Sequence, residues 1–512
     1  MLKTLTALAG LMLLASPLPS LADDGSGDGW PMFGNTLQNT ASASSGQQIA
    51  PADVARLKPA WVVTTGGDVS ARASVANHIA YFPDWGGNLW AVDTRSGTVL
   101  WHHLFTDYGL PSGTVARATP ALDGKTLYIG TQLGAYMLAI DARSGALEWK
   151  TQLDAHPEAI ITSSAALADG ALFVGVASNE ESAAANPSYQ CCSFRGSALA
   201  LDTASGRILW KTFMAPEGYS GTAVWGSNPV VDRGLHSVFF GTGNNYAKPT
   251  APAYLACVAR GGTEAQCHSP DDHFDSIVAL DMANGQFRWT RRLSNGDDWN
   301  VACLDSGADM ANCPTNAGVD ADFGSAPNEL TVRMHDGRSQ TILGAGQKNG
   351  VYSAFDPATG RMLWAQQVGP GATLGGIEWG SATDGQRIYV ALSNADHLAS
   401  AAGTAGSWNA LDPATGAVLW RTPDPSGAIA LGPVAVADGI VYAPSMAMDP
   451  QQPTMLALDA GTGKMLWQFA SGGSVVAGAS LADGMLLWGS GYAHLKNGSA
   501  NNKFYGFSLD GK

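Results

Sequence analysis

The stretch SNEESAAANPSYQCCSFRGSALALDTASGRILW (Ser178–Trp210) decides how the whole chain is interpreted. Its second half holds Ala200, Asp202, Gly206 and Trp210 in the spacing Ala-x-Asp-x-x-x-Gly-x-x-x-Trp. An Asp-led turn with a Gly for the positive-φ position, between two short apolar runs, is typical of a β-hairpin. The first half interrupts this pattern with two carboxylates and two adjacent cysteines, so scaffold and chemistry meet here.

The Asp, Gly and Trp of this hairpin recur along the chain, and the offset from Asp to Trp is eight residues in every copy. The other copies are Asp93/Gly97/Trp101, Asp141/Gly145/Trp149, Asp281/Gly285/Trp289, Asp356/Gly360/Trp364, Asp412/Gly416/Trp420 and Asp459/Gly463/Trp467. One such hairpin cannot bury its own apolar faces, so the copies must pack against each other. A radial stack of four-stranded sheets closes the set and protects the strand edges.

The two ends of the chain carry an eighth, divided copy of the repeat. FYGFSLDG (Phe504–Gly511) supplies its first half, and LKPAW (Leu57–Trp61) supplies its second half. Pairing of the last strand with the first would close a ring. The sequence therefore predicts an all-β fold, an eight-bladed β-propeller closed by its N- and C-terminal strands, with each repeat Trp docked between neighbouring blades.

The repeat runs nearly end to end through 512 residues, which favours one propeller domain over residues 23–512. The 62 Gly and 26 Pro suit a sheet protein with many turns. Lys3, an apolar run and a small-x-small site ending at Ala22 are typical of a signal peptide over residues 1–22. We therefore expect a periplasmic or secreted protein, with the polar segment 23–46 wrapped around the outside of the propeller.

The formal net charge of the chain is −15. An acidic surface argues against nucleic acid or an anionic membrane as a partner, and it would suit a basic protein. The apolar run of the leader is too short to cross a bilayer, and no later segment is long enough, so we expect no membrane span.

Six cysteines in a chain with an export signal indicate disulfides. Their spacing favours two local pairs, Cys257–Cys267 and Cys303–Cys313, each tying off a loop. The adjacent Cys191 and Cys192 form a vicinal disulfide, or enter two separate long-range bridges, or stay free thiols. No Cys-x-x-Cys occurs, so we expect neither a zinc site nor a covalent c-type haem.

The spacing between repeat tryptophans widens in the middle of the chain. Insertions fall at residues 219–228, 244–275 and 296–324. Long insertions in a repeat array map to loops on one face, which is often the binding face. We therefore expect blades three to five to carry the functional site.

Short strings spread over the chain after the leader carry a specific resemblance. In chain order they are SNEE, YQCCSFRGSALALD, VWGSNPVVD, GTGNNY, DxDFG, GQKNG and GGIEWG. On this repeat they resemble the quinoprotein alcohol dehydrogenases, which are eight-bladed propellers that use pyrroloquinoline quinone (PQQ), and among them the polyvinyl-alcohol type. The resemblance implies PQQ as the cofactor, with a metal ion beside it.

The resemblance assigns the metal ion to Glu180 and Asn244, whose oxygen atoms suit a hard cation such as Ca²⁺. Glu181 would point to the opposite side of an extended backbone, so we expect only one of the two glutamates to ligate. The residues that the resemblance places around the cofactor are Arg117, Thr162, Ser178, Cys191, Cys192, Trp225 and Lys348.

Physical chemistry agrees with several of these roles. Arg117 can bind a carboxylate in a bidentate manner, and Thr162 can donate its hydroxyl to another. Trp225 lies outside the repeat positions and can stack on a planar ring system. Lys348 can stabilise negative charge that develops on the quinone oxygens. Taken singly, the same residues would indicate a surface arginine, a strand start, a core tryptophan and a solvated turn.

The catalytic base is expected from a divided motif. Relatives of this type have Trp-Asp-x-Asp, but here the Trp is followed by Asn300, which cannot accept a proton, and an insertion precedes Asp-Ala-Asp-Phe-Gly. This arrangement makes Asp320 the base, with Asp297 and Asp298 as alternatives. Asp322 would add an anionic metal ligand that suits a lanthanide, although Ca²⁺ is the default.

Two functions follow from these observations. The first is an exported PQQ-dependent dehydrogenase that oxidises a small or polymeric alcohol, in particular a secondary one, and passes electrons to a soluble cytochrome c or similar acceptor. The alternative is a non-catalytic propeller scaffold of the outer-membrane assembly type. Such a scaffold would not need Glu180, Asn244, the cysteine pair or the large insertions.

Overall fold

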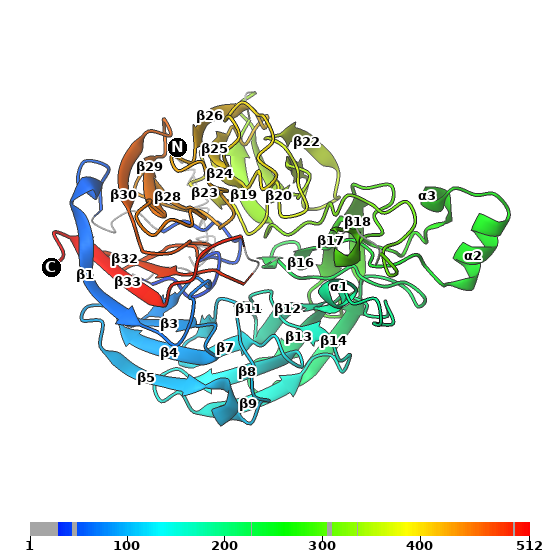
Figure 1. Cartoon of the computed structure of the whole chain (residues 1–512), viewed down its shortest axis with the longest axis horizontal. Helices are drawn as coiled ribbons and strands as arrows, with labels where there is room; N and C mark the ends of the chain where they lie inside the picture. Colours follow the sequence, from blue (N-terminus) through cyan, green and yellow to red (C-terminus); the bar gives the residue numbers. More distant parts are fainter. Residues whose placement is uncertain (1–28, 44–48, 227, 305–309, 335, 495–496) are drawn as a thin grey trace, which may run out of the picture.

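A computed structural model describes residues 29–43, 49–226, 228–304, 310–334, 336–494 and 497–512. The expected signal peptide lies outside these residues. Eight antiparallel sheets stand around a common centre, as Figure 1 shows, and the predicted eight-bladed propeller is confirmed. Among the described residues, no helix is long and apolar enough to cross a membrane.

Seven blades consist of strands that follow each other along the chain. Those of blades one to three are β2 (Ser74–Ala76), β3 (Ile79–Pro83), β4 (Asn88–Asp93), β5 (Val99–Leu104), β6 (Ala121–Asp123), β7 (Thr126–Gly130), β8 (Tyr136–Asp141), β9 (Leu147–Gln152), β10 (Ala159–Ile160), β11 (Ala166–Ala168), β12 (Ala171–Ser178), β13 (Ser197–Asp202) and β14 (Ile208–Phe213). Those of blades four and five are β15 (Val230–Asp232), β16 (Ser237–Gly241), β17 (Ser276–Asp281), β18 (Phe287–Arg292), β19 (Asn328–Arg333), β20 (Ser339–Gly346), β21 (Val351–Phe355) and β22 (Met362–Gln367). Those of blades six and seven are β23 (Ala382–Thr383), β24 (Ile388–Leu392), β25 (Ser407–Leu411), β26 (Val418–Pro423), β27 (Ala435–Ala437), β28 (Ile440–Pro444), β29 (Met455–Asp459) and β30 (Met465–Phe469).

The eighth blade joins the two ends of the described chain. Its strands are β31 (Ser480–Ala482), β32 (Met485–Ser490), β33 (Lys503–Leu509) and β1 (Leu57–Thr64). β1 pairs antiparallel with β33, from Leu57 opposite Leu509 to Thr64 opposite Lys503. This pairing is the predicted closure, and it leaves no gap between the first blade and the last.

The repeat residues hold each blade against the next. The indole of Trp149 covers the turn of the following blade, where a Cβ on Gly206 would lie 2.5 Å from the ring. The Trp149 Nε1 donates to the Thr203 carbonyl at 2.9 Å, and Gly206 has φ +69°. The Asp202 Oδ1 accepts from the Ser205 amide at 2.9 Å, which closes the turn. Gly is therefore required twice at this position, for its backbone angle and for the ring that packs on it.

The same docking occurs around the ring. All eight tryptophans at this position donate to a backbone carbonyl in the next blade, at 2.7 to 3.2 Å; they are Trp61, Trp101, Trp149, Trp210, Trp289, Trp364, Trp420 and Trp467. The expectation that the repeat tryptophans dock between blades is confirmed.

The segment 29–43 runs across the inner strands rather than around the outside, contrary to the sequence-based expectation. Its backbone pairs with Val75 of β2 and with Val436 of β27, and between them it accepts the amides of Leu122 and Glu329. With Val231 of β15 and Thr383 of β23, which also donate to this segment, its backbone pairs with six inner strands and satisfies polar groups that an outer wrap would leave to water. The segment thereby covers the face opposite the large insertions.

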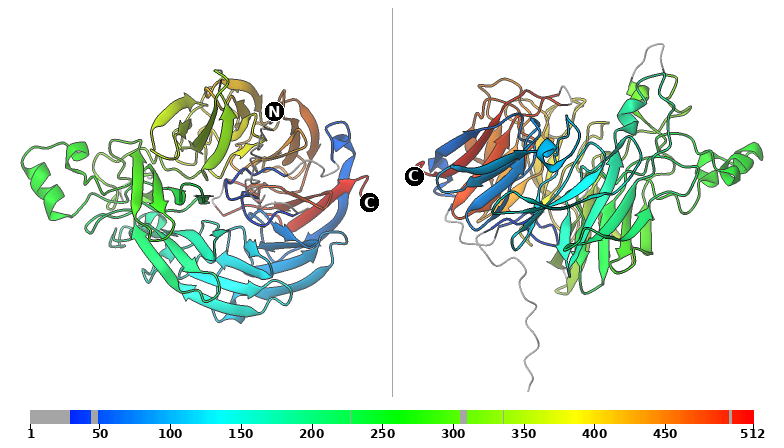
Figure 2. Two further views of the ribbon diagram at one scale, coloured as in Figure 1. Left: turned by 180° about the vertical axis from the view of Figure 1, so that it is seen from behind. Right: turned by 90° about the horizontal axis from the view of Figure 1, so that it is seen from below.

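The connections between strands fall on two faces because strand direction alternates. The Asp–Gly turns lie on one face, and the links from second to third strand and from one blade to the next lie on the other. The links β12–β13, β14–β15, β16–β17, β18–β19 and β20–β21 therefore open on the same face. They contain the helices α1 (Glu180–Ala183), α2 (Pro252–Ala259) and α3 (Glu264–Cys267), and α2 and α3 form an arm that projects from the ring in Figures 1 and 2.

The Trp–Gly contact predicts different effects at two glycines with similar backbone angles. Gly416 (φ +77°) lies under Trp364, where a Cβ would come within 2.5 Å of the ring, whereas a Cβ on Gly427 (φ +73°) would meet nothing within 4 Å. Gly427→Ala should cost about 1 kcal/mol of unfolding free energy from backbone strain alone. Gly416→Ala should cost about 2 kcal/mol more, because the ring must move. Equal losses in denaturant unfolding would contradict the docking account.

A buried carboxyl on the covered face predicts a pH-dependent loss of stability. Glu329 is 4% exposed and hydrogen-bonds the Asp232 carboxyl, and burial raises the pKa of Glu329 from 4.5 to about 8. The folded protein therefore holds a proton that the unfolded protein releases, so stability falls as pH rises from about 4.5 to 8. Glu329→Gln, which carries no such proton, should gain a few degrees of Tm relative to wild type at pH 8 but not at pH 5. The exposed control Glu217→Gln should show no such trend, and a parallel response of both variants would contradict this assignment.

Candidate functional site

Three carboxylates meet on the insertion face of the propeller. Glu181 of α1 and Asp320 and Asp322 of the β18–β19 link offer oxygen atoms that all lie within 4.8 Å of one another. Lys348, in the turn after β20, places its Nζ 2.7 Å from Asp320 Oδ1 and 3.1 Å from Asp322 Oδ2. Residues from blades three and five thus converge on one buried cluster.

Asp322 connects this cluster to blade four. Its Oδ1 accepts a hydrogen bond from the backbone N–H of Asn244 at 2.6 Å, and its Oδ2 accepts one from Trp225 Nε1 at 2.8 Å. The Lys348 Nζ lies 5.0 Å from the centre of the Trp225 ring. Asn244, Trp225, Lys348 and Asp322, four residues singled out in the sequence, therefore contact each other directly or through one side chain.

Burial sets the protonation chemistry of the cluster. It raises the pKa of Asp320 well above its usual range, and Asp322 and Glu181 add to the shift while Lys348 opposes it. Burial raises the pKa of Glu181 to about 8, with Lys348 opposing the shift and Asp322, Asp297 and Glu378 adding to it. Burial alone would lower the pKa of Lys348, but the surrounding carboxylates raise it well above its usual value. Asp320 and Glu181 therefore hold protons at neutral pH, and a cation that enters the cluster can take the place of those protons.

Asp297 supports the loop that carries Asp320. Its Oδ1 accepts from the Asp320 amide at 3.1 Å and its Oδ2 accepts from the Ala321 amide at 2.6 Å. Asp320 has φ +60°, a left-handed conformation that the two bonds help to hold. A Cβ on Gly318 would meet Asp297 at 1.8 Å, so the loop is packed tightly against this acid. The Asp297 side chain is committed to backbone amides, whereas Asp320 faces the cluster.

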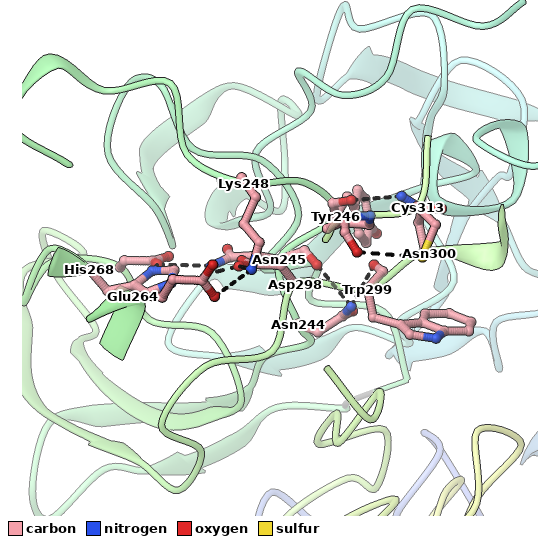
Figure 3. A network of polar contacts seen from close by, with 12 residues as sticks. Asn244, Asn245, Tyr246, Lys248, Glu264, His268, Asp298, Trp299, Asn300 and Cys313 are labelled. Carbon is pink, nitrogen blue, oxygen red and sulfur yellow. Dashed lines mark hydrogen bonds and ion pairs between the residues drawn. The ribbon is translucent and has the colours of Figure 1, made fainter. Parts of the chain in front are cut away.

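Asp298, the other alternative base, belongs to a separate polar network. Its Oδ2 pairs with Lys248 at 2.9 Å and lies 3.9 Å from His268 Nε2, while Lys248 also pairs with Glu264 of α3 (Figure 3). His268 Nδ1 contacts Asp272 at 2.8 Å. The network ties the projecting arm to the backbone beside Asn244.

Asn244 is oriented by this backbone. Its Nδ2 donates to the Asn245 carbonyl at 2.9 Å and to the Trp299 carbonyl at 2.8 Å, as Figure 3 shows. Both contacts use the nitrogen, so the amide oxygen is left without a hydrogen bond to a described residue. An amide oxygen held in this way is a suitable ligand for a hard cation.

The adjacent residues Glu180 and Glu181 have different surroundings. Glu180 is fully buried; its Oε1 accepts from Tyr189 and the Ser193 amide, and its Oε2 accepts from the Phe194 amide, at 2.8 to 3.0 Å. The sequence named Glu180 as the metal ligand, but the structure brings Glu181 to Asp320 and Asp322. The backbone here is a helical turn rather than extended, so alternation along a strand did not apply.

The remaining cofactor candidates lie around Trp225. Thr162 donates its hydroxyl to the Trp225 carbonyl, and the Trp379 ring meets the Trp225 ring edge-on with centroids 5.2 Å apart. The Arg117 guanidinium lies over Trp379, 4.0 Å from its centre. Ser178, at the end of β12, accepts from the Glu180 amide at 3.2 Å, so it supports α1.

All six cysteines are paired in the structure. Cys257–Cys267 ties α2 to α3, and Cys303–Cys313 ties the loop before Asp320, as the spacing predicted. Cys191 and Cys192 form the vicinal disulfide, which decides among the three alternatives. Cys192 packs against the same apolar cluster as Trp225, and Asn300 Nδ2 lies 3.9 Å from Cys191 Sγ.

Sequence reasoning missed two residues of this region. Glu378, 3% exposed, has an unpaired Oε2, and burial raises its pKa to about 7 while Lys348 and Arg117 lower it. Trp379 follows it and contacts Trp225. Both belong to the string GGIEWG, which was recognised as a motif but assigned no residue role.

The donor set fits the implied groups. Carboxylates with an amide oxygen are the ligands that a Ca²⁺ or lanthanide ion takes, and such an ion can displace the protons held at Asp320 and Glu181. The Arg117 guanidinium makes no ion pair with a described residue, so it can neutralise an anion such as a cofactor carboxylate. The Trp225 ring lies near the Lys348 ammonium of the carboxylate cluster and contacts Trp379, over which Arg117 lies.

Comparison with known proteins identifies the family. A family model described as "Outer membrane protein assembly factor BamB" matches residues 24–213, 137–291, 347–477 and 404–512, which is most of the chain. The chain belongs to this family of propeller repeats. The matched ranges overlap and span blades that are each built from antiparallel strands in the same order.

Individual relatives add functional names. Polyvinylalcohol dehydrogenase of Sphingopyxis sp. (strain 113P3) is 29% identical over 548 residues, which cover 97% of this chain and 79% of that protein. The structure of quinohemoprotein alcohol dehydrogenase ADHIIG from Pseudomonas putida HK5 superposes with a TM-score of 0.73, 18% identity, and coverage of 95% and 81%. The structure of a europium-containing methanol dehydrogenase superposes with a TM-score of 0.71 at 18% sequence identity. The match covers 94% of this chain and 98% of that one. The resemblance stated from the sequence motifs is confirmed.

The different surroundings of the two glutamates predict separable effects of substitution. Glu181→Gln should keep Tm within a few degrees but weaken Ca²⁺ binding at least about tenfold, because it removes one anionic ligand. Glu180→Gln should instead cost about 1–3 kcal/mol of unfolding free energy, because two backbone amides lose a charged acceptor in a fully buried position. Calorimetric Ca²⁺ titration and thermal unfolding measure the two effects. Loss of Ca²⁺ affinity in the folded Glu180 variant alone would contradict the assignment.

Proposed function

We propose that this protein is a PQQ-dependent alcohol dehydrogenase that oxidises an alcohol, in particular a secondary one, to a ketone or aldehyde. The observation that carries the proposal is the convergence of Glu181, Asp320, Asp322 and Lys348 beside the face of Trp225. A structural scaffold gains nothing from burying three acids together, because their mutual repulsion costs stability.

The proposed chemistry needs four contributions from the chain. PQQ, when bound, supplies a carbonyl carbon that accepts hydride. Asp320 removes the hydroxyl proton of the alcohol, once Lys348 and the bound cation lower its pKa and keep it ionised. Lys348 holds Asp320 in place and offers positive charge where oxygens gain negative charge. Trp225 and Arg117 orient the ring system and one of its carboxylates.

The proposed metal site consists of Glu181, Asp322 and the Asn244 amide oxygen, with Asp320 adjacent. Glu181 replaces Glu180 of the sequence-based assignment, because the Glu180 oxygens are occupied by amides and a phenol. Ca²⁺ remains the default ion. Asp322 adds anionic charge that would favour a trivalent lanthanide, so the metal preference of the site depends on this residue.

The wider setting completes the proposal. Substrates in view are small alcohols, polyvinyl alcohol or another hydroxylated compound. A separate acceptor, such as a soluble cytochrome c with a basic surface, would take the electrons, since the net charge of −15 suits such a partner. The leader predicted at residues 1–22 would place the enzyme in the periplasm or outside the cell.

The alternative of a scaffold has one observation in its favour, the description of the family model itself. The propeller repeat alone satisfies that model. The buried acids, the vicinal disulfide and the loops tied by two further disulfides lie outside the repeat, and they are what the dehydrogenase proposal explains.

Reconstitution tests the proposal directly. The purified protein with PQQ and Ca²⁺ or La³⁺ should reduce an artificial dye in the presence of secondary alcohols. Asp320→Asn should lower kcat by about 10²- to 10⁴-fold, which is what a positioned base contributes, without loss of quinone binding. Asp123→Asn, an exposed acid on β6, is the matched control and should keep full activity. Absence of both activity and quinone absorbance in wild type would favour the scaffold instead.

A further inference from the structure

Asp275 is a buried acid next to the loop that carries Asp320, and it takes no part in the proposed chemistry. It ends the insertion of blade four, directly before β17, and its side chain is fully buried. Its amide donates to the Gly243 carbonyl and its carbonyl accepts from the Leu293 amide, both at 3.1 Å. These bonds fix Asp275 to the strand ends of β16 and β18, so it belongs to the rigid part of the blade.

The Asp275 carboxyl forms a hydrogen bond with the carboxyl of Asp297. Two carboxyl groups can hydrogen-bond only when one of them carries a proton, since an ionised carboxylate only accepts. The Ser294 hydroxyl also reaches Asp275, but no backbone amide of a described residue donates to its carboxyl. Neither Asp275 nor Asp297 is exposed to solvent, so the pair holds one proton inside the protein.

The surroundings assign this proton to Asp275. Asp297 accepts from the amides of Asp320 and Ala321, and such bonds stabilise the ionised form of a carboxyl group. Burial raises the pKa of Asp275 well above its usual range, and the charges of Asp297 and Asp322 add to the shift. Burial also raises the pKa of Asp297, but the two amides and Asp275 oppose that shift. Asp275 is thus the donor and Asp297 the acceptor.

This bond connects the blade to the loop of the proposed base. The other two donors to Asp297 are amides of the loop itself, and they alone would let the carboxylate move with the loop. The donor from Asp275 comes from the blade, so it fixes the Asp297 carboxylate and, through it, the left-handed backbone of Asp320. A neutral donor does this without adding a buried negative charge near Asp322.

We propose that Asp275 is a positioning residue for Asp320, and that it acts as a protonated carboxylic acid which donates a hydrogen bond to Asp297. The proton and its bond are properties of the folded chain alone, whereas the effect on Asp320 as a base rests on the proposed function. The carboxylates of the proposed metal site are Glu181 and Asp322, so Asp275 acts beside that site and not as one of its ligands.

Neutron diffraction from deuterated crystals of the wild-type protein tests the first part. A deuteron should lie between the carboxyls of Asp275 and Asp297, covalently bonded to an Asp275 oxygen, both in the protein alone and with PQQ and Ca²⁺ bound. Absence of this deuteron, or a deuteron bonded to Asp297, would overturn the assignment. The measurement needs no activity, so it decides this point even if the protein oxidises no alcohol.

Variants of the reconstituted enzyme test the effect on Asp320. Asp275→Asn keeps a buried donor of nearly the same shape, so kcat should stay within about twofold of wild type. Asp275→Ala removes the donor, so kcat should fall at least about tenfold, the value of one hydrogen bond to a charged group, with the KM for the alcohol unchanged. Asp271→Ala, at an exposed acid of the same insertion, is the matched control and should keep full activity.

Rescue by asparagine separates positioning from the other roles of a buried acid. Equal losses of kcat in Asp275→Asn and Asp275→Ala would overturn the proposal in favour of proton transfer through Asp275. Unchanged kcat in both would overturn it in favour of an acid that serves stability alone. Asp275→Leu, which is close to aspartate in shape, replaces Asp275→Ala if that variant does not fold. If the wild type shows no activity, the proposed function fails, and a crystal structure of the variant without the donor decides: an unmoved Asp297 carboxylate and Asp320 loop would overturn the positioning role.

Discussion

Mutual repulsion of buried carboxylates is the constraint on which the site depends. Glu181, Asp320 and Asp322 come from two insertions far apart in the chain, and their oxygens lie within 4.8 Å of one another. Burial and this repulsion raise the pKa of Asp320 and of Glu181, so both hold protons at neutral pH until a cation replaces those protons. The arrangement persists because rigid blades hold the loop ends, and it favours any further cation that can enter. A metal ion is the species that we propose for these oxygen donors.

The propeller can hold these carboxylates close together because the contacts that stabilise the ring lie away from the candidate site. Tryptophans on the outer strands dock on glycines of the next blade, and β1 closes the ring with β33. These contacts use the Asp–Gly turns of one face, so insertions on the other face can vary without loosening the ring. Two further acids show how the loops are anchored. Asp297 holds the backbone of Asp320, and Asp298 ties the projecting arm to the strand end at Asn244.

The sequence was sufficient for the fold because the repeat is local. Spacing alone predicted eight blades, the closure by the terminal strands and the docking of the tryptophans. Two disulfides followed from spacing as well. Segment 29–43 was placed wrongly, because its backbone partners lie on six different blades and no local sequence pattern indicates such long-range pairing.

The site was predictable in its members but not in its contacts. Asp320, Asp322, Asn244, Trp225 and Lys348 gather as the motifs suggested. Spacing could not show which of Glu180 and Glu181 meets the two aspartates, because that depends on a helical turn. In this turn the Glu180 carboxylate accepts from the backbone amides of Ser193 and Phe194, and Glu181 lies beside Asp320 and Asp322.

A crystal structure of the protein grown with PQQ and La³⁺, phased on the anomalous signal of the ion, tests the central claim most directly. The account predicts the ion within about 2.3–2.6 Å of carboxylate oxygens of Glu181 and Asp322 and of the Asn244 amide oxygen, with Lys348 moved away from Asp322. An ion bound at Glu180, or an intact Lys348–Asp322 pair with no ion in the cluster, would contradict it.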